Sequence, residues 1–432
     1  MSNIKKLLEG VEVEWKTLGE IAENVSSGGT PNTGVEAFYG GNIPWLRTQE
    51  VGNGDIWSTS IKITELGLKN SSAKIIPANC IIVAMYGATV GKVGVNKIPL
   101  CTNQACANVQ INAKIANYRY VYHFLLSQYK YIKSLGAGSQ TNINLKIVKS
   151  LLIPIPCPNN PKKSLEIQQE IVRILDSFSM LTAELQAELQ ARKSQYEYYR
   201  NQLLAYSMEE SDQSSLRSNR SATSIQNSDN STQPLSTLNP HTGNSVLQPR
   251  GKVEWKVLEE VVEIKRGKRL IKNQLEKTGK YAVYQNCMIP LGYYHKNNVI
   301  ADTTFIISAG SAGEIGYSDV DFWAADDVYY FVTKNDLKSR FLYHFLITQQ
   351  QKIYSQVRRS SVPRLSKTAF EKLLIPIPSL EEQEHIVSIL DKFDALTTSL
   401  TEGLPKEIEL RQKQYEYYRN MLLSFPKNNI KA

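Results

Sequence analysis

Apolar side chains recur at alternating steps of four and three residues along two stretches of the chain. The first stretch covers residues 167–203 and the second covers residues 386–422. Such a heptad pattern is typical of a helix that buries one seam against a partner helix. The first helix would be on the order of 55 Å long. We predict that the two helices pair as an antiparallel coiled coil about a pseudo-two-fold axis.

The second helix is expected to be interrupted. Its seam contains two successive steps of four, at Leu400, Leu404 and Ile408, where four residues are inserted relative to the first copy. An insertion of four residues locally unwinds a coiled coil. Gly403 and Pro405 lie in the insertion, so we predict a kink or a break there.

Short apolar runs followed by glycines fill the stretches before each helix. Residues 80–84 and 304–307 have the composition of buried strands, whereas residues 118–131 and 340–354 have helical periodicity. This mixture predicts the α+β fold class.

Several strings occur twice, in the same order, which indicates a tandem duplication. VEWK occurs at 13–16 and 253–256, LLIPIP at 151–156 and 373–378, and QYEYYRN at 195–201 and 414–420. Around the last string, ten of thirteen positions match. We predict that the chain consists of five segments. They are residues 1–156, the first α+β domain; 157–206, a central helix; 207–250, a linker; 251–378, the second α+β domain; and 379–426, a C-terminal helix.

Composition narrows the class of protein further. The linker holds eleven Ser in 44 residues and no aromatic residue, too little apolar surface to order itself. The five cysteines include no CxxC pair, which argues against a zinc site or a disulfide framework. No apolar run is long enough for a membrane span or a signal peptide, so we expect no membrane association and a cytoplasmic location. A net charge of +9 is compatible with a polyanionic partner.

No motif indicates catalysis. Residues 87–93 imitate a phosphate-binding loop, but one spacer is missing and Val93 replaces the Mg²⁺-binding hydroxyl; a turn with positive-φ glycines is the better interpretation. The Asp326-Asp327 pair corresponds to Gln104-Ala105 in the first copy. His123 and His344 occupy equivalent positions on amphipathic helices, where a structural role is favoured over a catalytic one.

The duplicated unit resembles the DNA-specificity subunit of type I restriction–modification systems. Each motif is weak alone, and their order, repeated twice, carries the resemblance. The matching residues are 15–19, 42–46, 151–156 and 168–178 in the first copy, and 255–258, 292–294, 322–324, 373–378 and 383–393 in the second.

This resemblance implies that each variable α+β domain is a target-recognition domain that reads one half of a split site on double-stranded DNA. The two long helices would be conserved spacers that dock two modification subunits, which hold S-adenosylmethionine and methylate an adenine in each half-site. Two restriction subunits with ATP and Mg can join the complex. This chain itself would be non-catalytic and hold no cofactor.

Polar residues in turns between the predicted strands are the candidates for DNA contact, since Arg suits guanine and Asn or Gln suits adenine. In the first copy they are Arg47, Gln49, Lys92, Asn103, Gln104, Gln140 and Asn142. In the second copy they are Arg266, Lys268, Arg269, Gln285, Asn286, Arg358, Arg359 and Arg364. The basic stretch 264–269 fits phosphate contact and a solvated loop equally well.

The repeated QYEYYRN string supplies the candidates for partner docking. Its second and fifth residues, Tyr196 and Tyr199 in the first copy, fall on the seam. Tyr198 and Arg200, with Tyr417 and Arg419 in the second copy, are expected to point away from it. Exposed Tyr and Arg are typical interface anchors. The alternative is that the tyrosines fill a wide end of the helix bundle.

Two other functions remain open from the sequence alone. One is a DNA-binding coiled-coil scaffold unrelated to methylation. The other is a coiled-coil protein with no nucleic-acid role, which would show no salt-dependent DNA binding.

Overall fold

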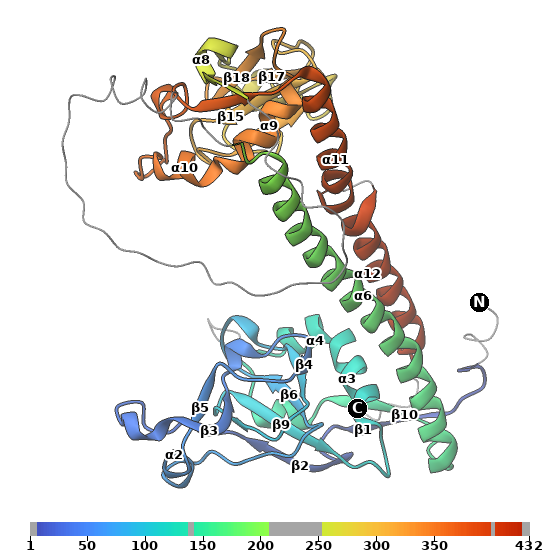
Figure 1. The fold of residues 1–432 in the computed structure, drawn as a ribbon. Helices are drawn as coiled ribbons and strands as arrows, with labels where there is room; N and C mark the ends of the chain where they lie inside the picture. Colours follow the sequence, from blue (N-terminus) through green and yellow to red (C-terminus); the bar gives the residue numbers. More distant parts are fainter. Residues whose placement is uncertain (1–6, 137–141, 207–252, 399–401, 426–432) are drawn as a thin grey trace, which may run out of the picture. The chain divides into compact units, whose positions relative to one another are not determined.

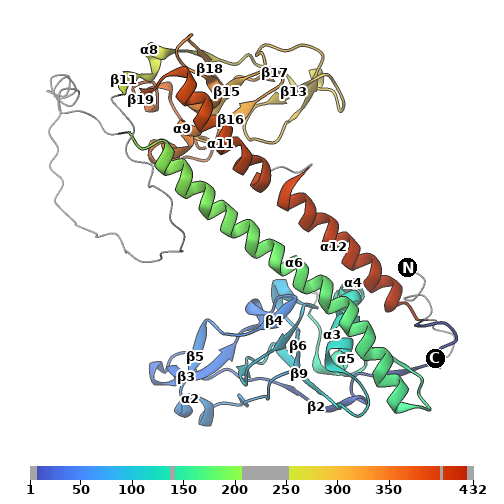
Figure 2. The ribbon, with the colours of Figure 1, turned by 45° about the vertical axis from the view of Figure 1, so that its right-hand side comes forward.

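The computed structural model describes residues 7–136, 142–206, 253–398 and 402–425 of the chain. The predicted linker 207–250 lies outside these residues. The chain divides into two compact units (Figures 1 and 2). Unit 1 contains Met1–Gln186 and Glu407–Ala432, and unit 2 contains Ala187–Lys406. Each unit therefore combines the α+β domain of one copy with the end of the helix that belongs to the other copy.

The α+β domain of unit 1 is built on two sheets. The five-stranded sheet has the order β2 (Ala22–Ser27), β9 (Cys106–Ile111), β6 (Ile81–Ala84), β7 (Val93–Asn96) and β4 (Gly54–Ile56). The three-stranded sheet has the order β5 (Ile61–Ile63), β3 (Tyr39–Leu46) and β8 (Cys101–Thr102). The helices of this domain are α2 (Glu65–Lys69), α3 (Tyr118–Ser127), α4 (Tyr129–Ser134) and α5 (Leu145–Lys149), with short 3₁₀ turns η1 (Glu36–Phe38), η2 (Thr48–Glu50) and η3 (Gly87–Thr89).

The domain of unit 2 repeats this arrangement. Its four-stranded sheet has the order β12 (Val262–Arg266), β18 (Val328–Thr333), β15 (Thr303–Ile307) and β16 (Ile315–Ser318). Its three-stranded sheet has the order β14 (Gly292–Tyr294), β13 (Tyr281–Tyr284) and β17 (Phe322–Ala324). The remaining elements are α8 (Leu258–Val261), η4 (Lys272–Gln274), α9 (Ser339–Thr348), α10 (Gln350–Ser355) and η5 (Lys367–Ala369). The predicted α+β class and the duplication are thus confirmed.

The central strands β6 and β15 are buried at every position because they lie between two cores, and β6 is also apolar at every position. Ile81 and Val83 belong to the main core of unit 1, whereas Ile82 and Ala84 belong to a second, smaller core. Successive side chains of a strand point to opposite faces. A strand that is covered on both faces therefore reads as a continuous apolar run, which is the pattern that predicted it.

The duplicated VEWK and LLIPIP strings pair with each other inside each unit. β1 (Val13–Thr17) pairs antiparallel with β10 (Leu152–Pro156), and β11 (Glu254–Val257) pairs in the same way with β19 (Leu374–Ile377). Both ribbons have only two strands, and proline is tolerated in edge strands. The segments by which the chain enters and leaves each domain therefore lie side by side.

The first predicted helix is continuous, as α6 (Pro161–Leu203). The second is broken into α11 (Leu380–Thr398) and α12 (Gly403–Leu422). Gly403 has φ +79°, and a Cβ atom there would lie 2.7 Å from the carbonyl oxygen of Ala395, so glycine is required at the break. The predicted interruption is confirmed.

Aromatic stacking shows how the long helices pair. In unit 1 the ring of Phe178 on α6 stacks on Tyr418 of α12, with centroids 5.1 Å apart. In unit 2 the ring of Tyr199 on α6 stacks on Phe393 of α11, with centroids 5.6 Å apart. A later residue of α6 meets an earlier residue of the second helix, which is the antiparallel order predicted from the sequence.

The helical runs predicted at 118–131 and 340–354 each form two helices. Gln128 separates α3 from α4, and Gln349 separates α9 from α10, with ψ near zero at both residues. The apolar periodicity continues across both junctions, so the sequence pattern alone does not reveal the bend.

Candidate nucleic-acid interface

Loops from four parts of the first domain are joined by backbone hydrogen bonds near the ends of strands β3, β6 and β8. Asn103 N donates to Leu46 O (2.9 Å), Met85 N donates to Ala105 O (2.8 Å), and Ile143 N donates to Met85 O (3.0 Å). We call residues 47–50, 85–92, 103–105 and 142–143 the first loop cluster. Most of the DNA-contact candidates of the first copy lie in it.

The second domain forms an equivalent cluster through equivalent bonds. Ala325 N donates to Tyr284 O (2.9 Å), Ser308 N donates to Asp327 O (2.7 Å), and Leu365 N donates to Ser308 O (2.8 Å). We call residues 266–269, 285–286, 308–314, 325–327 and 358–365 the second loop cluster.

These bonds align the two clusters residue by residue. Arg47 corresponds to Gln285, Gln104 to Asp326, and Asn142 to Arg364. The same backbone frame therefore presents different side chains in the two domains.

Several candidates in the first cluster are already engaged within the protein. Arg47 Nε lies 3.2 Å from the Glu50 carboxylate, and Arg47 Nη2 donates to Ser60 Oγ (3.2 Å). Burial by itself would raise the pKa of Glu50, but hydrogen bonds from Ser60 and Arg47 lower it overall. Asn103 Oδ1 accepts a hydrogen bond from Thr48 Oγ1 (2.9 Å). Asn103 thus helps to hold the cluster together.

The other first-copy candidates vary in exposure. Gln49 and Gln104 are exposed, and Gln104 accepts a hydrogen bond from the Thr30 hydroxyl. Lys92 and Asn142 are half-buried, and Asn142 Oδ1 accepts a long 3.4 Å bond from Gly87 N. The remaining candidate, Gln140, lies outside the described residues.

The second cluster is more basic and more exposed. Arg266 at the end of β12, and Lys268 and Arg269 in the loop after it, are exposed. Arg266 Nε donates to Asp326 O (2.7 Å). A Cβ atom at Gly267 would lie 2.1 Å from Ala325 O, so the backbone of this loop packs closely against the backbone of Ala325.

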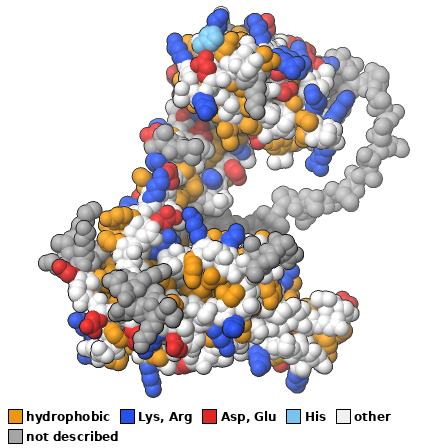
Figure 3. Space-filling model, turned by 180° about the vertical axis from the view of Figure 1, so that it is seen from behind, with side chains coloured by type: hydrophobic (Ala, Val, Ile, Leu, Met, Phe, Trp, Pro, Cys, Tyr) orange, Lys and Arg blue, Asp and Glu red, His pale blue; other side chains and the backbone are white. Residues whose placement is uncertain are grey.

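The remaining second-copy candidates lie in two other loops of this cluster. Gln285 is half-buried and Asn286 is exposed, whereas Arg358, Arg359 and Arg364 are all exposed. Figure 3, a view of one face, shows Lys and Arg side chains projecting from the surface of both units.

The structure adds two residues that the sequence did not place among the DNA-contact candidates. Tyr86 is 41 % exposed in the first cluster, immediately before Gly87. Its signal in the sequence is an aromatic residue before a glycine-rich turn. Trp323 Nε1 donates to Lys268 O (2.9 Å) and so positions the basic loop.

The interpretation of residues 87–93 as a glycine turn is confirmed, since Gly87 and Gly91 have φ of +79° and +82°.

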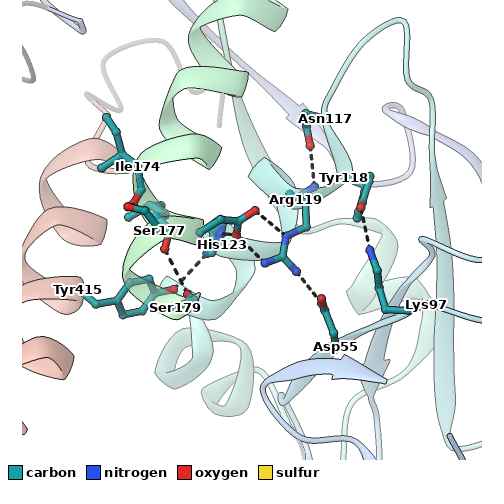
Figure 4. A network of polar contacts seen from close by, with 12 residues as sticks. Asp55, Lys97, Asn117, Tyr118, Arg119, His123, Ile174, Ser177, Ser179 and Tyr415 are labelled. Atoms are coloured by element: carbon teal, nitrogen blue, oxygen red, sulfur yellow. Dashed lines mark hydrogen bonds and ion pairs between the residues drawn. The ribbon is translucent and has the colours of Figure 1, made fainter. Parts of the chain in front are cut away.

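A buried polar network joins the domain of unit 1 to both long helices (Figure 4). His123 is fully buried; its Nδ1 lies 3.1 Å from the Tyr415 hydroxyl and its Nε2 lies 2.7 Å from Asp176 Oδ1. Arg119 bridges Asp176 (2.5 Å) and Asp55 (2.6 Å). We call Arg119, His123, Asp176 and Tyr415 the first buried network.

Unit 2 contains the same network from the other copies of these residues. His344 Nδ1 lies 3.2 Å from the Tyr196 hydroxyl, and its Nε2 lies 2.8 Å from Asp391 Oδ1. Arg340 bridges Asp391 (2.7 Å) and Asp394 (2.8 Å). We call Arg340, His344, Asp391 and Tyr196 the second buried network. Its position inside a packed helix junction fits the structural role predicted for both histidines.

Burial and hydrogen bonding shift the pKa values of the histidines and of their carboxylate partners. Burial lowers the pKa of His123 and His344, because a charged imidazolium is poorly solvated there. Burial alone would raise the pKa of Asp176, but hydrogen bonds from His123 and Arg119 lower it overall. A lowered pKa favours the neutral imidazole, and in the tautomer with the proton on Nε2 that nitrogen donates to the carboxylate while Nδ1 accepts from the tyrosine hydroxyl.

These contacts explain the placement of the QYEYYRN residues. Tyr196 and Tyr415 point into the two networks, whereas Tyr198 and Tyr417 are 61 % and 59 % exposed. Arg200 lies over the Tyr196 ring at 5.4 Å and is half-buried.

Arg419 is equally half-buried, over the Tyr415 ring at 5.5 Å. The two tyrosines thus point outward as expected, while the two arginines lie along the helix surface.

Among the described residues, no group of three His, Cys, Asp or Glu side chains could hold a metal ion. Asp326 Oδ1 is buried without a hydrogen-bond partner.

No helix within the described ranges has the length and apolar character needed to cross a membrane.

Comparison with known proteins decides the family. A family model described as "Type I restriction modification DNA specificity domain" matches residues 10–192 and 251–410. The chain belongs to this family. The match covers both recognition domains and most of the long helices.

Full-length relatives agree with this assignment. The specificity subunit of the Escherichia coli type I restriction enzyme EcoR124I/EcoR124II is 31% identical, over 99% of this chain and 98% of that protein. That of the E. coli enzyme EcoprrI is 29% identical, over 93% of this chain and 92% of that protein.

A solved structure supports the fold. The S subunit of a type I restriction–modification system from M. genitalium is 18% identical and covers 97% of this chain and 98% of that chain, with a TM-score of 0.61. This protein is therefore a specificity subunit, the non-catalytic subunit that recognises DNA and works with other subunits of a type I system. The scaffold alternative is not favoured.

Proposed function

We propose that this specificity subunit reads a bipartite DNA site, with one loop cluster on each half-site. The observation that carries the proposal is the residue-by-residue alignment of two clusters on one backbone frame with different side chains. Because the backbone is alike in the two clusters, both domains can dock on DNA in a similar geometry. Because the side chains differ, the two domains can recognise different half-sites. DNA contact is assigned to Arg47, Gln49, Lys92, Asn103, Gln104, Gln140 and Asn142, and to Arg266, Lys268, Arg269, Gln285, Asn286, Arg358, Arg359 and Arg364.

In this proposal Asn103 acts mainly through Thr48, because its amide oxygen is already bonded there. Gln49 and Gln104 are exposed and can reach base edges directly. The second cluster supplies most of the phosphate contacts, since its cations are exposed.

The chain directs chemistry that its partners perform. Two modification subunits hold S-adenosylmethionine and methylate one adenine in each half-site, and two restriction subunits bring ATP and Mg for cleavage. The complex acts in the cytoplasm, where the DNA is.

Two equal docking sites for the modification subunits are formed by Tyr198 and Arg200 and by Tyr417 and Arg419. The equal exposure of the two tyrosines and the equal stacking of the two arginines support two identical partners.

Methylation mapping tests the proposal directly. The chain is co-expressed with its modification subunit in a host that lacks adenine methylation, and N6-methyladenine is mapped across the genome. One split motif methylated on both strands is the expected result. Exchange of residues 253–378 for another recognition domain should change only one half of that motif. A stable complex that methylates no motif, or that methylates adenines without sequence preference, would contradict the proposal.

A further inference from the structure

Residues 358–364 form a small hairpin at the second loop cluster, which we call the arginine hairpin. Arg358 N donates to Arg364 O (2.9 Å), and Arg364 N donates to Arg358 O (3.2 Å). Ser360 Oγ donates to Val362 O (2.6 Å) across the tip. The hairpin is thus ordered by its own hydrogen bonds, although almost all of its side chains are exposed.

The base of the hairpin is fixed to the recognition domain. Gly310 N donates to Pro363 O (3.1 Å), and the buried Leu365 anchors the chain through Ser308 O. Gly310 has φ +81°, and a Cβ atom there would lie 2.6 Å from Asn286 O. The hairpin therefore stands next to the loop that carries Asn286, within the second cluster.

The pairing of Arg358 with Arg364 is unfavourable for the isolated protein. Directly opposed residues of an antiparallel pair place their side chains on the same face, and like charges in such positions repel each other. Among the described residues, no side chain forms a hydrogen bond or ion pair with the guanidinium group of Arg358, Arg359 or Arg364. An anionic or electron-rich partner would relieve this repulsion.

The carboxylates of the second cluster do not neutralise the hairpin. Glu314, Asp326 and Asp327 are half-buried in neighbouring loops and make no ion pair with it. Exposed cations of the same cluster, Lys268 and Arg269, add to the positive charge.

We propose that the arginine hairpin enters the major groove of the half-site read by the second domain, where Arg364 contacts a guanine and Arg359 contacts a phosphate. This inference rests on the proposed function. A two-stranded ribbon fits the major groove, and arginine makes a bidentate contact with O6 and N7 of guanine. Asn142 occupies the equivalent position in the first cluster, so this position differs between the two domains in the type of base that it suits.

Exchange of the side chain at this position tests base reading. The complex of the chain with its modification subunit is prepared with Arg364→Asn, and its methylated motif is compared with that of the unchanged complex. We expect a guanine in one half-site to be lost or replaced by adenine, while the other half-site stays the same. Binding to the original site should weaken on the order of 10- to 100-fold. An unchanged motif with unchanged affinity would overturn the inference.

A salt titration provides a second measurement that does not depend on the Arg364 variant. Arg359→Ala should lower affinity similarly for all sequences and reduce the slope of log affinity against log salt by about 0.9, the value for one lost phosphate contact. Lys334→Ala is the matched control. It removes an exposed cation from the opposite end of β12, where Lys334 N donates to Val261 O. Equal slopes for Arg359→Ala and the unchanged chain would also overturn the inference.

The two proposals fail in different ways. If the unchanged complex methylates no defined motif, the proposed function fails. If it methylates a split motif that neither hairpin substitution affects, only the hairpin inference fails.

Discussion

The hydroxyl of Tyr415 lies 3.1 Å from Nδ1 of His123, although 292 residues separate them in the sequence. The equivalent pair in unit 2, Tyr196 and His344, is separated by 148 residues. In both pairs the tyrosine comes from one copy of the duplicated unit and the histidine from the other. The repeated QYEYYRN string therefore makes the same contact twice. In each case its first tyrosine forms a hydrogen bond with the buried histidine of the other copy's domain.

Removal of the Tyr415 hydroxyl should destabilise unit 1. Tyr415→Phe leaves the buried Nδ1 of His123 without a donor, which costs about 1–3 kcal/mol. Urea unfolding followed by circular dichroism measures this cost. Tyr417→Phe is the matched control, because its hydroxyl is on an exposed side chain two residues away, and it should change stability by less than about 0.5 kcal/mol. Equal stability of the two variants would show that the hydrogen bond contributes nothing.

Stability should fall on mild acidification. Burial lowers the pKa of His123 and His344 in the folded chain, so the unfolded chain binds more protons below about pH 6.5. The free energy of unfolding is therefore highest above that pH. It decreases as the pH falls from the histidine pKa of the unfolded chain toward that of the folded chain, by up to about 1.4 kcal/mol per pH unit for each histidine.

Urea midpoints at pH 7.5, 6.5 and 5.5 test this dependence. His123→Gln combined with His344→Gln should flatten the dependence, whereas His295→Gln, on an exposed strand end, should not. A double variant that keeps the full dependence would assign it to other groups.

A methyl group at Gly28 should distort the first recognition domain. A Cβ atom there would lie 2.0 Å from Thr102 O, a backbone atom that cannot move independently. We expect Gly28→Ala to cost about 1–3 kcal/mol. Gly52→Ala serves as the control, since no atom lies within 4 Å of its added Cβ. Thermal unfolding of the two variants measures the difference.

Truncation of the exposed tyrosines should weaken assembly and leave the fold intact. Tyr198→Ala and Tyr417→Ala each remove a side chain that is about 60 % exposed on a long helix. We expect each substitution to weaken binding of the modification subunit by about tenfold, measured by titration calorimetry, with unchanged unfolding midpoints. Binding equal to that of the unchanged chain would leave the tyrosines without a docking role.

Periodicity and repetition predicted much of the fold. The continuous helix α6 and the break near Gly403 follow from local rules that tertiary packing did not override. The sequence could not assign Tyr196 to His344 rather than to His123. The two copies are alike, so the pattern fits packing on either domain, and only the three-dimensional arrangement distinguishes them.

The candidate site was harder to predict than the fold. The loops that carry Arg47, Gln104 and Asn142 are distant in sequence, and the hydrogen bonds that join them use backbone atoms, which leave no signature in side-chain identity. The residue type of Asn103 suits adenine, but its contact with Thr48 appears only in the folded chain.

The antiparallel ribbons β1–β10 and β11–β19 have a consequence for how such genes change. Because Val13 pairs with Pro156, and Glu254 with Ile377, each recognition domain is inserted through two adjoining strands. A recombination event with breakpoints in these repeated strings would replace a whole domain, including the histidine and arginine of its buried network. It would leave the long helices, which supply the aspartate and tyrosine partners of that histidine, as they were. Under the proposed function, such an event changes one half of the DNA target in a single genetic step and leaves the other half unchanged.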